Sequence, residues 1–250
     1  MLALITGASS GMGRDMARIL AKKGYDLILV ARRKERMLEL KKELGTNITI
    51  ISMDLSVEEN CFKLYGKVRN KKIDVLINNA GFGLFGEFVK TDLDTELKMI
   101  DLNIKSYHIL TKLFLQDFVK RDEGYILNVC SSAGFMVGPR LSTYYATKNY
   151  VTKLTMAINE ELRVAKSHVT ISALCPGPVA TEFNEVAHGT FAIREASSYE
   201  VAKYAIDKLF QRKMIIVPTL MMKLTLFFNR LAPYRLSLYI AYKIQMRKSK

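Results

Sequence analysis

The chain has 250 residues, is 49% hydrophobic and carries a formal net charge of +14, which is enough apolar material for one large core without a linker to divide it. Ten of the 38 Lys and Arg residues lie from Lys208 onward, whereas all 24 Asp and Glu residues precede that point, so the basic excess belongs to the C-terminal tail and predicts no nucleic-acid partner. Three scattered cysteines and three histidines without ligand spacing exclude a disulfide framework, predict no metal site and suit the cytoplasm.

Short apolar runs alternate along the chain with segments of helical length, and Met1 leads straight into the first run, so we expect no secretion signal. The runs that predict strands are Leu2–Ile5, Asp26–Val30, Ile48–Met53, Ile73–Ile77, Gly124–Val129, Val169–Leu174 and Met214–Val217. Such alternation requires crossover connections, which make the strands parallel and place helices on both faces of the sheet. We therefore predict an α/β fold with a doubly wound, parallel, seven-stranded sheet.

A glycine-rich turn follows the first strand and opens the next helix. Its sequence is Thr6-Gly7-Ala8-Ser9-Ser10-Gly11-Met12-Gly13. Gly7 permits a tight turn, Gly11 lets the backbone approach a pyrophosphate, and Gly13 lets the helix pack closely on the strand. The N–H groups at the start of the helix face the anion. An ordinary strand-to-helix turn is the alternative, but the strand and helix on either side favour a dinucleotide-binding (Rossmann) site.

The end of the second strand indicates which dinucleotide binds. NAD sites usually carry Asp or Glu there to accept a hydrogen bond from the ribose 2′-OH, whereas this chain has Ala31-Arg32-Arg33. A guanidinium suits a 2′-phosphate, so Arg32 and Arg33 predict NADP (NADPH) rather than NAD. A solvated basic helix start is the alternative, although positive charge opposes the helix dipole there.

Asp54 and Leu55 follow the third strand. They are expected to receive the adenine amino group and pack its ring. Asp54 is equally suited to cap the next helix, and the two interpretations are compatible.

A second group of residues predicts chemistry. Tyr144 and Lys148 are four residues apart, so a helix places both side chains on one face. A phenol has an ordinary pKa of about 10 and needs a nearby cation to act as an acid–base group at neutral pH, which Lys148 would supply. The pair alone could be structural. Ser131 ends the fifth strand thirteen residues earlier, with Ser132 as a competing serine.

Taken together, the motifs resemble those of the short-chain dehydrogenase/reductase family. They are T-G-x-x-x-G-x-G at 6–13, N-N-A-G at 78–81, Asn103, Ser131, Y-x-x-x-K at 144–148 and P-G-x-V-x-T at 176–181. The resemblance covers residues 1–215 and implies an NADP(H)-dependent enzyme that interconverts an alcohol and a carbonyl group of a small molecule. It also implies a homodimer or homotetramer, held by helices over residues 92–119 and 142–165.

The resemblance implies a role for each catalytic residue. Tyr144 would be the general acid in reduction and the base in oxidation, and Ser131 would hold the substrate oxygen. Lys148 would lower the pKa of Tyr144 and grip the nicotinamide ribose. Asn103 would hold a water linked to Lys148, or else satisfy buried backbone groups. Tyr145 is a rival that lacks a lysine at the fourth position onward.

Two further turns are expected to contact the cofactor. Asn79-Ala80-Gly81 would approach its ribose, and Pro176-Gly177-Pro178-Val179-Ala180-Thr181 would engage the nicotinamide carboxamide. Plain turns are the alternative for both. Ser10 departs from the family pattern, because many NADP-dependent relatives carry Arg or Lys there, and this leaves the 2′-phosphate to the two arginines.

Apolar residues around the expected pocket favour an apolar substrate, although they could equally belong to the core. They are Phe82, Phe85, Phe135, Met136, Phe183 and Phe191. The segment 182–197 is expected to close over this pocket. Steroid, lipid ketone, sugar and quinone derivatives all stay open as substrates.

We expect residues 1–217 to form the dinucleotide-binding and catalytic domain and residues 218–250 to form a tail. The tail predicts two apolar helices broken at Pro233, with only basic charges. This combination favours contact with a membrane surface or with a lipid-like substrate entrance, and packing on a partner subunit is the alternative. For the chain as a whole, a non-catalytic NADP-binding sensor or scaffold is the alternative from another functional class.

Overall fold

The computed structural model describes residues 1–183 and 195–246. Seven parallel strands form one sheet in the order β3-β2-β1-β4-β5-β6-β7. The strands are β1 (Leu2–Thr6), β2 (Asp26–Ala31), β3 (Ile48–Ser52), β4 (Val75–Asn78), β5 (Tyr125–Val129), β6 (Thr170–Leu174) and β7 (Ile215–Ile216). All seven predicted strands are present, and the doubly wound parallel sheet is confirmed.

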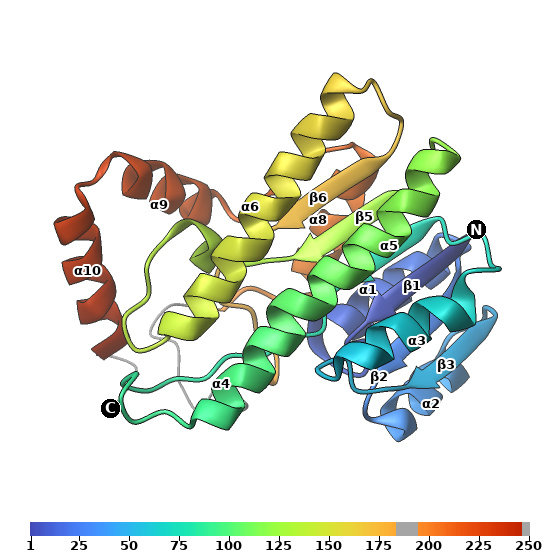
Figure 1. Cartoon of the computed structure of the whole chain (residues 1–250), viewed down its shortest axis with the longest axis horizontal. Helices are drawn as coiled ribbons and strands as arrows, with labels where there is room; N and C mark the ends of the chain where they lie inside the picture. Colours follow the sequence, from blue (N-terminus) through green and yellow to red (C-terminus); the bar gives the residue numbers. More distant parts are fainter. Residues whose placement is uncertain (184–194, 247–250) are drawn as a thin grey trace.

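Helices cover both faces of this sheet (Figure 1). On one face lie α1 (Gly11–Lys22), α2 (Lys34–Glu43) and α8 (Ser198–Phe210). On the other lie α3 (Glu58–Val68), α5 (Ser106–Lys120) and α6 (Ser142–Val164). Because both faces are covered, the strands are continuous apolar runs rather than alternating ones, which is why the sequence made them visible.

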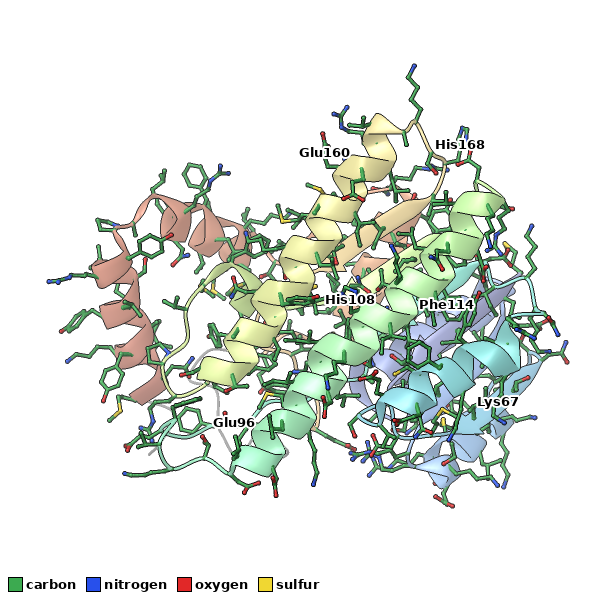
Figure 2. The ribbon with its side chains drawn as sticks, in the orientation of Figure 1. Lys67, Glu96, His108, Phe114, Glu160 and His168 are labelled. Atoms are coloured by element: carbon green, nitrogen blue, oxygen red, sulfur yellow. The ribbon has the colours of Figure 1, made fainter. Side chains whose placement is uncertain are left out.

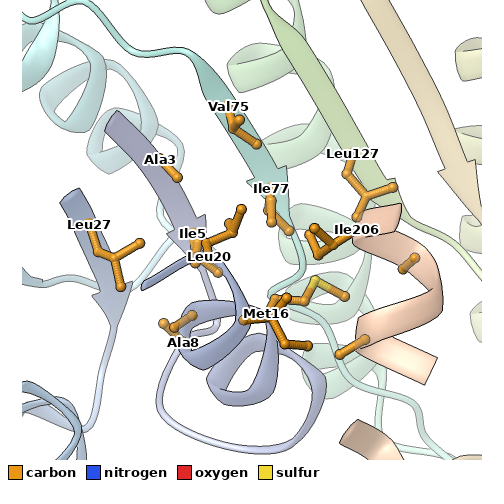
Figure 3. Packing of buried hydrophobic residues seen from close by; sticks show 14 of the residues in the cluster. Ala3, Ile5, Ala8, Met16, Leu20, Leu27, Val75, Ile77, Leu127 and Ile206 are labelled. Carbon is orange, nitrogen blue, oxygen red and sulfur yellow. The ribbon is translucent and has the colours of Figure 1, made fainter. Parts of the chain in front are cut away.

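Two hydrophobic clusters, one on each face, hold the helices to the sheet. On the first face, Met16 and Leu20 of α1 pack with Ile5 of β1 and Ile206 of α8 (Figure 3). Neighbouring strand residues point to opposite faces, so Leu4 joins the second cluster with residues of α3, α5 and α6. Burying each such side chain contributes about 1.5–3 kcal/mol. The carboxyl ends of the strands are thereby fixed along one edge.

The helix that leads to the site on the second face is not regular throughout. It begins as α4 (Leu93–Ile100), passes through a π-helical turn, η1 (Asp101–Lys105), and continues as α5. Asp92 caps it by accepting a hydrogen bond from the Thr95 N–H at 2.8 Å. The wider turn changes the register of the helix and coincides with the buried Asn103.

Two short helices follow β7 and extend away from the sheet (Figure 1). They are α9 (Leu220–Leu231) and α10 (Tyr234–Met246), separated at Pro233 as the sequence predicts. Met222 and Gln245 are buried, while most of the apolar side chains of both helices are exposed. Across the described ranges, no helix is both long and apolar enough to span a bilayer.

Candidate active site

The glycine-rich turn between β1 and α1 is tied to the end of β4. Asn79 donates from its side chain to the carbonyl oxygens of Thr6 at 3.0 Å and Gly7 at 3.2 Å. Gly7 has a positive φ of +65°, which L side chains rarely adopt. A Cβ on Gly13 would lie 2.4 Å from the Gly7 carbonyl oxygen. The turn therefore needs both glycines to keep α1 close to the strand, with the helix N-terminus facing the cavity.

Arg33 lies over this turn, whereas Arg32 points outward. The Arg33 guanidinium donates to the hydroxyl of Ser10 at 2.8 Å and to that of Ser9 at 3.4 Å. The Arg32 side chain is 75% exposed and comes no closer than 4.0 Å to Asp54. Of the two predicted phosphate-binding arginines, Arg33 is thus the one already placed beside the turn.

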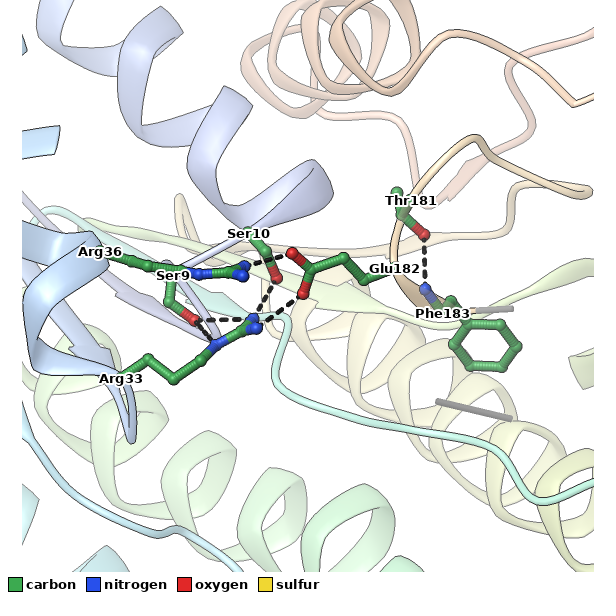
Figure 4. Close-up of polar contacts among 7 residues, drawn as sticks. All are labelled: Ser9, Ser10, Arg33, Arg36, Thr181, Glu182 and Phe183. Atoms are coloured by element: carbon green, nitrogen blue, oxygen red, sulfur yellow. Dashed lines mark hydrogen bonds and ion pairs between the residues drawn. The ribbon is translucent and has the colours of Figure 1, made fainter. Parts of the chain in front are cut away.

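Glu182 forms ion pairs with two arginines across the cavity (Figure 4). It accepts from Arg33 at 2.8 Å and also from Arg36. Arg36 and Glu182 were not singled out from the sequence. Their opposite charges were the only sign in the sequence that they could pair. Because Arg33 and Glu182 are 149 residues apart, the sequence does not show that they meet.

Asp54 does not cap the next helix. Its carboxylate accepts from the backbone N–H and the hydroxyl of Ser56 at 3.0 and 2.8 Å, while α3 begins at Glu58 with Val57 in the cap position. The helix starts later than the sequence suggested because Asp54 closes a local turn first. The buried Leu55 lines the cavity beside it.

Tyr144 and Lys148 lie on α6, one turn apart, beside the end of β5. The Lys148 ammonium is 4% exposed and donates to the Val129 carbonyl at 2.9 Å. It lies 5.9 Å from the centre of the Tyr144 ring. Burial lowers the pKa of Lys148 to about 8, since desolvation disfavours the charged form.

The pKa of Tyr144 is raised well above its ordinary value by burial, and a hydrogen bond with Ser131 opposes this shift only in part. Lys148 is not among the causes of this shift, and its effect on the phenol stays a prediction. Desolvation dominates, because the ammonium is engaged by the Val129 carbonyl rather than by the phenol. Tyr144 is consequently protonated at neutral pH, the form that can donate a proton.

Asn103 is fully buried and bonds to backbone next to the catalytic pair. Its side chain donates to the Phe82 carbonyl at 2.8 Å and accepts from the Phe82 N–H at 3.2 Å. It also donates to the Thr147 hydroxyl at 3.2 Å. A Cβ on Gly81 would lie 2.9 Å from the Asn103 oxygen and 3.5 Å from the Lys148 nitrogen. The two bonds to Phe82 are those expected of a side chain that pairs with buried backbone groups. Asn103 and Lys148 also lie close to each other, on the same side of Gly81.

The two competing residues have other partners. The Ser132 N–H donates to the Pro176 carbonyl at 2.8 Å, which joins the ends of β5 and β6. The Tyr145 hydroxyl accepts from the Gln245 side chain at 3.1 Å, which joins α6 to α10. Tyr144 instead lies beside Phe183, with ring centres 5.1 Å apart.

One cavity of about 440 Å³ brings the predicted residues together. All the predicted site residues line it except Gly13, which lies under the turn, and Asn103. Those that line it are Gly7, Ser9, Ser10, Gly11, Met12, Arg32, Arg33, Asp54, Leu55, Asn79, Ala80, Gly81, Ser131, Tyr144, Lys148, Pro176, Gly177, Val179 and Thr181. The cavity therefore extends from the phosphate turn to the catalytic tyrosine.

The apolar residues predicted to surround the substrate divide into two groups. Phe82, Met136 and Phe183 line the cavity. Phe85 and Phe135 do not, and they lie instead against Arg140 and Lys153. Phe191 and most of the predicted closing segment lie outside the described residues.

The tail, for which the sequence suggested a substrate entrance as one role, contributes a wall of the cavity. The residues concerned are Met222 and Thr225 of α9 and Ala241, Ile244 and Gln245 of α10. A Cβ on Gly177 would lie 3.0 Å from Met222, so α9 packs directly on the turn after β6. The sign of this in the sequence is that the tail has more apolar residues than one amphipathic helix face requires.

The histidines that the structure describes lie apart from this cavity (Figure 2). His108 bonds to the Tyr150 hydroxyl at 2.8 Å, and His168 pairs with Asp122 at 2.6 Å. His188 lies outside the described residues. Within the described part of the chain, no three His, Cys, Asp or Glu side chains are grouped so that they could hold a metal ion.

Comparison with known proteins gives a consistent assignment. The model of the short chain dehydrogenase family matches residues 1–192. Dehydrogenase/reductase SDR family member 11 of Bos taurus is 34% identical over 213 residues, which is 81% of this chain and 84% of that protein. The NADP-dependent 3-hydroxy acid dehydrogenase YdfG of Escherichia coli O6:H1 is 34% identical over 192 residues, covering 74% of this chain and 76% of that one.

Among solved structures, a short-chain dehydrogenase from Sphingobium yanoikuyae in complex with NADPH superposes with a TM-score of 0.81 at 30% identity, covering 88% of both chains. This chain therefore belongs to the short-chain dehydrogenase/reductase family of oxidoreductases.

Proposed function

We propose that the protein is an NADP(H)-dependent oxidoreductase that transfers a hydride between the nicotinamide and an alcohol/carbonyl pair of an apolar small molecule. The observation that carries the proposal is one cavity that joins the phosphate turn and Arg33 at one end to Ser131, Tyr144 and Lys148 at the other. A dinucleotide is long enough to bridge these two groups.

The residues at the open end fit a dinucleotide phosphate. The turn offers the N-terminus of α1 for the pyrophosphate, and Arg33 beside Ser9 and Ser10 offers a fork of donors for a 2′-phosphate. The names of YdfG and of the Sphingobium complex both include NADP or NADPH, which supports the same choice here. When bound, the nicotinamide supplies the hydride in reduction and accepts it in oxidation.

At the other end, the side chains handle the proton. In reduction, the Tyr144 hydroxyl donates its proton to the carbonyl oxygen as the carbonyl carbon gains the hydride, and the phenolate is later reprotonated from solvent. The Ser131 hydroxyl donates a hydrogen bond to the same oxygen and keeps it beside the phenol. The Lys148 charge stabilises the phenolate that is left, and Asn103, next to Gly81, holds a water in the path of returning protons.

The test is Tyr144→Phe, with Tyr145→Phe as the matched control on the same helix. We expect Tyr144→Phe to lose NADPH-dependent ketone reduction by a factor of about 10²–10⁴, the usual contribution of a general acid, while NADPH binding in calorimetry is unchanged. Tyr145→Phe should keep most of the activity. Retained turnover in Tyr144→Phe would mean that another group is the acid.

A non-catalytic sensor or scaffold has no support in this site, since the complete acid–base group lies in the nucleotide cavity. The two functions differ in one measurement. A sensor binds NADPH but oxidises none of it with any carbonyl compound, whereas the enzyme shows turnover that depends on Tyr144.

The walls around Tyr144 favour an apolar substrate. Those that contact the cavity beyond the tyrosine are Met136, Val137, Leu141, Phe183, Met222 and Ile244. Apolar walls with a few polar groups are typical of sites for hydrophobic ligands. A panel of steroid, lipid and aromatic ketones, with a sugar ketone as the polar control, should give the higher kcat/KM for the apolar compounds.

We also propose a homodimer or homotetramer built on the helices over residues 92–119 and 142–165. Large apolar side chains on their outer surface are exposed, among them Leu93 at 66%, Leu97 at 48% and Val119 at 47%. A partner subunit would cover them. Sedimentation should give at least a dimer at micromolar concentration, and a monomer would contradict this assembly.

For the tail, we propose peripheral contact of a cytoplasmic protein with a membrane surface, with residues 1–217 as the catalytic domain and 218–250 as the tail. Phe227 and Phe228 are 60% and 63% exposed, and all charged residues of α9 and α10 are basic. Exposed aromatic residues with basic charge suit an interface of anionic lipids.

Because the tail also lines the cavity, point variants test this contact better than truncation does. Phe227→Ser with Phe228→Ser should abolish binding to vesicles with anionic lipid and leave NADPH affinity and the oligomer intact. Dissociation of the oligomer would assign these residues to the subunit interface. Full-length protein that ignores such vesicles at low salt would exclude membrane contact.

A further inference from the structure

Glu182 connects the arginines at the open end of the cavity to the segment beside the catalytic tyrosine (Figure 4). One carboxylate oxygen accepts from Arg33 at 2.8 Å and the other accepts from Arg36. The three side chains are 34%, 45% and 41% exposed, for Glu182, Arg33 and Arg36 respectively. A ligand can therefore reach them without unfolding any part of the site.

The remaining donors of Arg33 hold it to the phosphate turn through Ser9 and Ser10. The hydrogen bond from Arg36 lowers the pKa of Glu182, with partial burial opposing it and Arg33 adding to it. Glu182 is accordingly an anion at neutral pH. The group consists of two cations that share one carboxylate directly above the turn.

A 2′-phosphate needs the same donors that Glu182 occupies. Guanidinium groups bind phosphate and carboxylate through the same planar pair of N–H groups, and two anions at one position repel each other. NADH carries an uncharged 2′-hydroxyl instead, which does not compete with the carboxylate. Of the two cofactors, only NADPH therefore carries a group that competes with the Glu182 carboxylate for these arginines.

We propose that Glu182 is a cofactor-selecting residue: its carboxylate stands in for the 2′-phosphate on Arg33 and Arg36 and so weakens binding of NADPH relative to NADH. The inference rests on the proposed NADP(H) function and adds a residue that restrains its preference. Glu182 acts through the arginines, so its effect must appear only with ligands that carry the 2′-phosphate.

The residues on either side of Glu182 connect it to the phosphate turn and to the catalytic tyrosine. Thr181 lies against Gly11, where a Cβ would be 2.9 Å from its methyl group. Phe183 lies beside Tyr144, with ring centres 5.1 Å apart. Glu182 lies between Thr181 and Phe183, so a phosphate that displaces Glu182 also shifts the contact of Phe183 with Tyr144. We therefore expect the KM for the carbonyl substrate to differ between NADPH and NADH.

The experiment compares 2′,5′-ADP with 5′-AMP, which differ only in the 2′-phosphate, and then NADPH with NADH, by calorimetry on the full chain. Glu182→Gln keeps the shape of the side chain and removes its charge. We expect it to bind 2′,5′-ADP and NADPH about fivefold more tightly, as the loss of two partly exposed ion pairs allows, with 5′-AMP and NADH unchanged. The substrate KM values with the two cofactors should also become more alike.

Glu43→Gln is the matched control, because Glu43 pairs with Arg18 at 2.6 Å, its side chain is 42% exposed, and it does not line the cavity. It should leave all four affinities unchanged. Equal or weaker binding of 2′,5′-ADP by Glu182→Gln, while the wild type binds it well, would overturn the inference and leave the NADP(H) function standing. If the wild type and Glu182→Gln both bind 5′-AMP and 2′,5′-ADP equally, the inference and the NADP(H) preference are both overturned.

Discussion

Lys148→Met removes a charge that the fold keeps out of water. Lys148 is 4% exposed, and its pKa falls from 10.5 to about 8 because of burial. At about 1.36 kcal/mol per pH unit, this difference opposes folding by about 3 kcal/mol at pH 7. The hydrogen bond that is lost costs little, since the Val129 carbonyl still accepts from the Tyr107 hydroxyl at 3.2 Å. We expect the variant to be inactive and yet more stable at pH 7, by about 2–3 kcal/mol.

The pH dependence follows from the direction of the shift. Below pH 8 both the folded and the unfolded wild type hold the proton on Lys148, so the whole penalty is present. Between about 8 and 10.5 only the unfolded state holds it, and the penalty disappears as pH rises. Urea unfolding should therefore show a gain of about 2–3 kcal/mol at pH 7 and under about 1 kcal/mol at pH 10.

Lys67→Met is the control, because Lys67 lies exposed on α3 (Figure 2). It should change the free energy of unfolding by less than about 0.5 kcal/mol at either pH. A Lys148→Met variant less stable than the wild type at pH 7, or one with the same gain at both pH values, would refute the argument that burial of the charge sets the lysine pKa.

Three further predictions concern the same site. The kcat/KM for carbonyl reduction should fall as pH rises through about 8, where Lys148 loses its proton, and a flat profile up to pH 9.5 would contradict this role. Gly13→Ala should lower the free energy of unfolding in urea by about 1–3 kcal/mol, because the new Cβ would meet the Gly7 carbonyl; Gly66→Ala, where a Cβ meets nothing within 4 Å, should be neutral or stabilising. Arg33→Asp should reduce the preference for NADPH in calorimetry more than Arg32→Asp, whose side chain is 75% exposed, and equal effects would show that both arginines hold the phosphate.

The sheet could be predicted because its strands are buried on both faces, so each is a short apolar run that stands out from the helices. The turn at Gly7 and the pair on α6 could be predicted because their geometry depends on residues close in sequence. Contacts between distant segments could not. The pairing of Glu182 with Arg33 spans 149 residues, and nothing local marks either partner.

The pKa shifts of Tyr144 and Lys148 could not be predicted from the sequence either. The spacing of Tyr144 and Lys148 predicts their proximity but not their burial, and burial dominates both pKa values. The tail was interpreted as a surface because its charges are all basic. Its apolar content also suggested a substrate entrance, but which of its residues line the cavity depends on how α9 packs on Gly177.

Because α9 and α10 follow the catalytic residues along the chain, their position has a consequence for biosynthesis. The turn, the arginines and the catalytic tyrosine all leave the ribosome before the helices that complete the substrate wall. A nascent or prematurely terminated chain can therefore form its nucleotide site while the pocket is still open on the side of Met222 and Gln245. Selection among substrates is thus acquired after the nucleotide site during synthesis.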